Sequence, residues 1–177
     1  YAEMILTQLE YPERDIELAK IDAILHDIGN VVNRTDHAQS GAVMAFRLLD
    51  NLSMPADEIA TIVSAIGNHD ESTAQPINAI AAALIIADKT DVRRSRVRNQ
   101  DLTSFDIHDR VNYAVTKANL YFSDDKTRLI LDLNIDTEIS SVLEYFEIFL
   151  ERMLLCKRSA EYFKVKFSMN INGSAIL

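Results

Sequence analysis

The period of the hydrophobic pattern changes along the chain, and this change constrains the fold more than any other feature. Apolar residues recur every three or four positions through roughly the first half of the chain, as in amphipathic helices. In residues 129–135 and 165–171 they alternate with polar residues, which is typical of strands with one buried face. The pattern predicts a mainly α protein that ends in a small segment containing strands.

Five helices are predicted in the first half, followed by a second group of elements. The five cover about residues 1–9, 14–28, 37–52, 55–67 and 76–88, and Pro12, Pro55 and Pro76 mark breaks or first turns. The most apolar helix, from Pro76 to Asp88, is expected at the centre of the core. Further along we expect a helix at 111–120 and a long helix at 139–153, with Asp136 or Thr137 as its cap.

These elements suggest a helical domain at residues 1–125 and a strand-helix-strand extension at 126–177, packed on the same body. Two strands alone are marginal in water. They would therefore pair on the helical body, on each other over the helix, or across a dimer. The sequence leaves these three arrangements open.

Composition limits the class of protein. The 177 residues include 48% hydrophobic residues, enough for a buried core. The 18 basic and 27 acidic residues give a net charge of −9, which disfavours nucleic acid and anionic membranes as partners. No apolar run is long enough to cross a bilayer. The single cysteine, Cys156, lies in a predicted helix and fits a reduced, cytoplasmic setting.

Histidine and aspartate side chains follow one another in an order that suits a metal centre. His26 and Asp27 end an apolar helix just before Gly29, a glycine that can break the helix, and His37, His69 and Asp88 come later. Imidazole together with carboxylate suits one or two divalent transition metals such as iron, manganese, zinc or nickel. Because a carboxylate has two oxygens, Asp27 can bridge a pair of ions, which an imidazole cannot do.

These residues resemble the HD superfamily of metal-dependent phosphohydrolases, over roughly Tyr1 to Arg98. The adjacent pair is His26-Asp27 in Leu25-His26-Asp27-Ile28-Gly29, and Asp88 in Ala87-Asp88-Lys89 is similar to the family's late aspartate. The resemblance implies a helical bundle of the HD-domain type. It also implies that His37 and His69 are the two further ligands found in branches that bind two metals.

Two positions depart from the family's pattern. The family's first histidine would fall a few residues before Tyr1, and Asn30 stands where many relatives carry a lysine. The segment from His37 to Asp88 most resembles the branch that hydrolyses dinucleoside polyphosphates. A cyclic-dinucleotide substrate ranks lower, because Asp70, not a second histidine, follows His69.

The hypothesis that follows is an enzyme in which metals held by these five residues activate water to attack phosphorus in a phosphomonoester or a nucleotide or dinucleoside polyphosphate. Asp27 and Lys89 are the candidate catalytic residues. Lys89, Arg93 and Arg94 are candidates to bind the substrate's phosphate, with Asp91 orienting one of them.

Other readings stay open. The chain could be a catalytically degenerate regulatory module that binds metal or nucleotide through the same fold. Four arginines follow the predicted metal-binding segment: Arg93, Arg94, Arg96 and Arg98. They would serve equally as a solvated face that forms salt bridges with surface acids. A less favoured interpretation is that they bind RNA. The stripe Phe146, Phe149 and Met153 predicts either core packing or a homodimer contact.

Overall fold

The computed structural model describes residues 1–97, 99 and 104–176, and they form two compact units. The first comprises Tyr1–Asp88 and the second Lys89–Leu177. Within the described residues, none of the helices combines the length and the apolar character needed to cross a bilayer.

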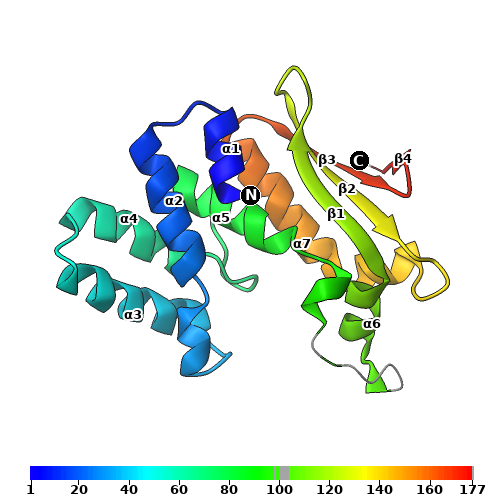
Figure 1. The fold of residues 1–177 in the computed structure, drawn as a ribbon, viewed down its shortest axis with the longest axis horizontal. Helices are drawn as coiled ribbons and strands as arrows, with labels where there is room; N and C mark the ends of the chain where they lie inside the picture. The colour runs from blue at the N-terminus through cyan, green and yellow to red at the C-terminus, as the bar shows by residue number, and fades with distance from the viewer. Residues whose placement is uncertain (98, 100–103, 177) are drawn as a thin grey trace. The chain divides into compact units, whose positions relative to one another are not determined.

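The first unit is built from helices (Figure 1). In chain order these are α1 (Ala2–Gln8), α2 (Glu13–Leu25), the short 3₁₀ helix η1 (Ile28–Val31), α3 (His37–Asn51), α4 (Ala56–Gly67) and α5 (Ala79–Lys89). The helix α5 carries the most continuous run of buried apolar residues, from Ile80 to Ile86. The prediction that this segment lies in the core is confirmed. The α3–α4 pair forms a helical hairpin, visible in Figure 1.

Charged residues join helices at the surface of the first unit. The Arg14 guanidinium on α2 donates through Nε and Nη2 to the two carboxylate oxygens of Glu58 on α4, at 2.7 and 2.6 Å. A two-pronged pair of this kind fixes orientation as well as distance. It holds the start of α2 against α4.

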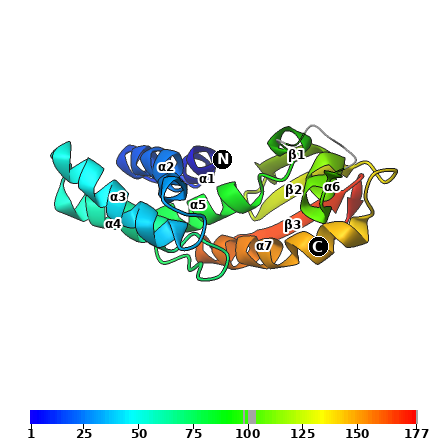
Figure 2. The ribbon, with the colours of Figure 1, turned by 90° about the horizontal axis from the view of Figure 1, so that it is seen from below.

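The second unit contains a four-stranded sheet and the long helix α7 (Val142–Tyr162). The strands are β1 (Val115–Phe122), β2 (Arg128–Ile135), β3 (Lys166–Ile171) and β4 (Ser174–Ala175), in that order across the sheet. The strands β2 and β3 are parallel, with Leu131 opposite Met169, and α7 connects them and contacts β3 (Figure 2). Of the three arrangements left open, the strands therefore pair with each other over the helix. The buried Phe149 and Met153 belong to this unit's core.

Several boundaries differ from those predicted. The helix expected at 14–28 ends at Leu25, and the short 3₁₀ helix η1 begins at Ile28, before the predicted end. The helix expected at 111–120 is α6 (Ile107–Ala114) followed by β1. The cap of α7 is Ser141, whose hydroxyl and the Glu144 carboxylate form a capping box. The prediction that Asp136 or Thr137 caps this helix was wrong. The short strand β4 was not predicted, and Arg98 lies outside the described residues.

The division expected near residue 125 falls inside the second unit. The strand β1 lies before that position and pairs antiparallel with β2, which lies after it. A boundary placed there would cut a hydrogen-bonded hairpin. Because the helix expected at 111–120 is a strand over most of its length, its residues group with the sheet.

Candidate metal centre

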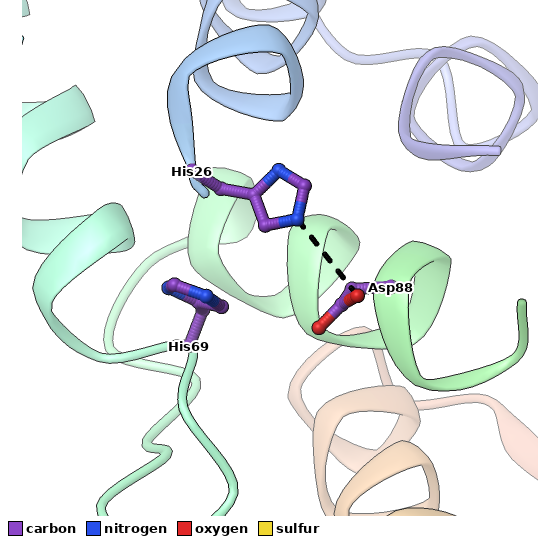
Figure 3. Close-up of side chains that lie close together, drawn as sticks. All are labelled: His26, His69 and Asp88. Carbon is purple, nitrogen blue, oxygen red and sulfur yellow. Dashed lines mark ion pairs between the residues drawn. The ribbon is translucent and has the colours of Figure 1, made fainter. Parts of the chain in front are cut away.

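All five predicted ligands belong to the first unit, and the structure brings them together. His26 and Asp27 follow α2, and His37 is the first residue of α3. His69 lies just after α4, while Asp88 is near the end of α5. Figure 3 shows His26, His69 and Asp88 converging from three separate segments. Two sets of side chains there could hold a metal ion: His26, His69 and Asp88, and Asp27, His37 and His69.

The Asp27 carboxylate lies between two groups of donors. One oxygen, Oδ2, is 3.7 Å from Nε2 of His26, which in turn is 3.8 Å from Oδ1 of Asp88. The other oxygen, Oδ1, is 3.3 Å from Nε2 of His37 and 3.8 Å from Nε2 of His69. Each oxygen therefore faces a different set of ligand atoms. With two oxygens directed at two groups of side chains, the carboxylate would be able to contact two ions.

The three histidines are oriented by the same local contact. In each, Nδ1 lies against the backbone carbonyl three residues earlier: His26 with Ala23 at 2.8 Å, His37 with Arg34 at 3.0 Å, and His69 with Ile66 at 2.6 Å. A carbonyl oxygen only accepts hydrogen bonds, so Nδ1 carries the proton. Whenever such a ring is neutral, its Nε2 atom keeps the lone pair, the form in which histidine binds metals.

Two of these lone pairs face each other in the protein interior. Nε2 of His37 is 3.2 Å from Nε2 of His69, and both side chains are buried. Two unprotonated nitrogens at this distance repel, and the nearby Oδ1 of Asp27 adds a negative charge. A cation bound by these atoms would remove the repulsion. The donor set therefore fits a divalent transition metal.

The electrostatics of the centre keep Asp27 ionised. Contact with His69 lowers the pKa of the Asp27 carboxyl far below its usual range, against the opposing effect of partial burial. A positive charge on any of the three imidazoles, whenever that ring is protonated, acts in the same direction. The carboxylate is available as a ligand at any pH near neutrality.

Glycine at position 29 allows the segment after the pair to lie directly on α3. A Cβ there would be 2.0 Å from the carbonyl oxygen of His37 and 2.6 Å from the backbone nitrogen of Gly41. The role predicted for Gly29, ending the α2 helix, is thus replaced by close backbone contact, since α2 already ends at Leu25. This contact holds Asp27 beside His37.

Two residues at the centre were missed by the sequence analysis. Arg34 Nη1 lies 3.7 Å from Oδ1 of Asp27 and donates to Oδ1 of Asn30 at 3.3 Å, while most of its side chain is exposed. Asp70 Oδ1 lies 3.9 Å from Nδ1 of His37. Asn30 stands after Gly29 where many relatives carry a lysine. Arg34, four residues further on, places a positive charge beside the Asp27 carboxylate. The sequence does not show this proximity of Arg34 to Asp27, because it depends on how the chain turns at η1.

The three predicted phosphate-binding residues belong to the second unit. Lys89 is buried and directly follows Asp88 at the end of α5. Arg93 donates through Nε to Asp91 at 2.8 Å, the pairing expected for one arginine of this segment. Arg94 donates through Nε to the carbonyl of Tyr113 at 2.7 Å, and its guanidinium stacks 4.3 Å above the Tyr113 ring. The contacts of Arg94 anchor it within its own unit.

Comparison with known proteins agrees with this geometry. A family model described as HD domain matches residues 1–93, more than half of the chain. No curated protein matches the chain, and no solved structure does. The match spans every residue of the clustered histidines and aspartates. The chain therefore belongs to the HD domain family, whose members are in general metal-dependent phosphohydrolases.

Proposed function

We propose that the chain hydrolyses a phosphomonoester or a nucleotide or dinucleoside polyphosphate with the help of two divalent transition metals. The observation that carries this proposal is the position of Asp27, whose two oxygens face two different groups of donors. His26, Asp27 and Asp88 would hold one ion, and Asp27, His37 and His69 the other. Two ions at these positions would supply Lewis acidity, which activates water near neutral pH and neutralises phosphoryl charge.

The chain's own residues prepare the centre for this chemistry. The backbone carbonyls at Ala23, Arg34 and Ile66 hold the imidazoles with Nε2 directed inward. The buried positions of His37 and His69 keep bulk water away from one side, while Asp27 and Arg34 are more exposed and border solvent. Substrate would therefore approach from the side of Asp27.

Arg34 is the residue of the first unit best placed to meet the substrate's phosphate. Its guanidinium lies 3.7 Å from Asp27 and is mostly exposed, so its remaining donors can bind phosphoryl oxygens. Lys89, Arg93 and Arg94 stay predictions for the same task. Both arginines are engaged through Nε, Arg93 with Asp91 and Arg94 with Tyr113, and the side chain of Arg93 is the more exposed of the two. The likeness of residues 37–88 to dinucleoside-polyphosphate hydrolases supports that substrate class.

Elemental analysis of the purified protein beside an Asp27→Asn variant tests the proposal. We expect about two iron, manganese, zinc or nickel ions per chain. In the variant we expect loss of at least one ion and a fall in phosphate release of about 100-fold or more, because even residues that only support metal ligands have effects of 10- to 100-fold. Asp50→Asn, an exposed aspartate on α3, is the matched control.

The outcomes separate the enzyme from the regulatory module. Unchanged metal content and unchanged phosphate release in Asp27→Asn would overturn the proposal. Bound metal without turnover of p-nitrophenyl phosphate, nucleotides or dinucleoside polyphosphates would favour a regulatory module. Arg34→Ala, with Arg47→Ala as its control, should raise KM and leave the metal content unchanged if Arg34 binds phosphate.

A further inference from the structure

The helix α7 has two apolar faces, and one of them is exposed. Its buried face, with Tyr145, Phe149 and Met153, belongs to the core of the second unit. On the other face Leu143, Leu150 and Leu154 are 69%, 49% and 49% exposed. Separations of seven and four residues place these three leucines in a single stripe along the helix.

Charged residues continue the same stripe. Glu147 lies between the first two leucines, and Lys157 and Glu161 follow the third; all three are exposed. The six positions are separated by alternating steps of four and three residues, the spacing of a helix that packs along another helix. Leucine therefore occupies the middle of the stripe, and charge lies toward its ends.

We propose that this stripe binds the same stripe of a second copy of the chain, with the two α7 helices antiparallel. A two-fold axis between Leu150 and Leu154 places each of these leucines opposite the other in the second copy. The same register places Glu147 opposite Lys157 of the second copy, and the symmetry repeats this ion pair. A parallel pair would instead place each Glu147 beside its own equivalent, so like charges would meet.

A hollow at the end of the stripe agrees with this register. It has a volume of about 330 Å³ and is lined by Lys157, Glu161, Val165, Lys166 and Phe167. Antiparallel pairing brings Leu143 of the second copy opposite Glu161, at the rim of this hollow. The apolar side chains of Val165 and Phe167 offer a surface on which that leucine can be buried.

The expected interface is small. A helix of 21 residues is about 31 Å long, and one helix pair covers an area near the lower limit for specific interfaces, on the order of 1,000 Å². The dimer should therefore exchange with the monomer at micromolar concentrations.

Sedimentation velocity of the whole chain, at about 1 to about 100 µM, tests the proposal. We expect a concentration-dependent dimer. Leu150→Glu combined with Leu154→Glu should weaken it by at least about 100-fold, because the centre of the seam would bury four carboxylates. Leu52→Glu, on a leucine of the first unit that is 69% exposed, is the matched control and should leave the dimer unchanged.

Charge reversal tests the register without altering the leucines. Glu147→Lys alone should weaken the dimer about tenfold, and Glu147→Lys with Lys157→Glu should restore it. Both positions are exposed, so these variants decide the question even if the double leucine variant fails to fold. A monomer at the highest concentration, or a dimer that neither set of variants changes, would overturn the proposal.

Discussion

The two units of the chain use their buried volume differently. The first buries Asp22, His37 and His69 among its helices and places two of these at the candidate metal centre. In the second, the strands β2 and β3 and the inner face of α7 bury mainly leucine, isoleucine, phenylalanine and methionine. Burying polar groups costs free energy unless they find partners. The first unit accepts that cost at the candidate metal centre and at Asp22, whereas the sheet and the inner face of α7 are stabilised mainly by apolar packing.

This difference implies that substitutions in the two units should separate ligand binding from stability. Changes around η1 and α3 should affect the metal content first. Changes in the core between α7 and the sheet should affect stability first and leave the metal ligands in place.

The largest combined effect is expected for Gly29→Ala. A methyl group there would lie 2.0 Å from the His37 carbonyl, so η1 and α3 must move apart, at a cost of about 3 kcal/mol or more. Because this movement separates Asp27 from His37, the metal content should fall as well. Thermal unfolding and elemental analysis of the same samples measure both effects.

Gly67→Ala is the matched control, because a Cβ at that position meets only ordinary contacts, the nearest at 3.8 Å from Ala42. It should keep its metal and lose little stability. If Gly29→Ala behaves like Gly67→Ala, the close contact between η1 and α3 does not hold the centre together.

Phe149→Ala should produce the opposite pattern. The side chain is buried in the core of the second unit, and its ring lies edge to face on Tyr145, with ring centroids 5.3 Å apart. Its loss should lower the free energy of unfolding by about 3 to 5 kcal/mol. Metal content at low temperature should stay unchanged, and the exposed Phe46→Ala should change neither quantity. Loss of metal in Phe149→Ala would show that the second unit supports the centre.

Asp22→Asn should have the smallest effect, with a definite pH dependence. Asp22 is buried on α2 and neither carboxylate oxygen has a hydrogen-bond partner within the described part of the chain, so burial raises its pKa well above the usual range. The contribution of this group to stability is complete below its unfolded pKa of about 4 and is lost as pH rises toward the folded value. The variant should therefore gain about 1 to 3 kcal/mol over the wild type at pH 8, and less at pH 5.

Asp125 in the second unit gives a control of opposite sign. The Ser123 hydroxyl, together with the backbone and hydroxyl of Thr127, lowers its pKa to about 2. Its contribution is present above the unfolded pKa and is lost as pH falls through about 2. Asp125→Asn should therefore be destabilising near neutral pH and neutral near pH 2. Parallel pH profiles for the two variants would contradict the environments described for both carboxyls.

Periodicity predicted the elements whose apolar residues repeat without interruption. The five helices of the first unit and the strands β2 and β3 have this property, so their existence followed from the sequence. The strand β1 does not, because a bulge between Val115 and Lys117 shifts the register. Val115 and Ala118 of this strand also continue the spacing of Val111 in the preceding helix α6, so the segment imitates a longer helix.

That the candidate ligands lie close together was predictable, because it depends on residue type and order. The roles of Gly29 and Arg34 were not, because each depends on how η1 turns and on what α3 places beside it. The cap of α7 is an intermediate case. Ser141 and Glu144 form a recognisable pair three residues apart, and Asp136 competed with them as an equally good capping residue.

The carbonyl contacts of the three histidines have a consequence for how the centre forms. Each ring is set by a backbone group only three residues away, so its orientation depends on local secondary structure and not on a side chain from another element. Once each short segment is folded, little rotational freedom of these rings is left to lose. Docking of the segments then has only to bring ready-made nitrogen donors within reach of Asp27.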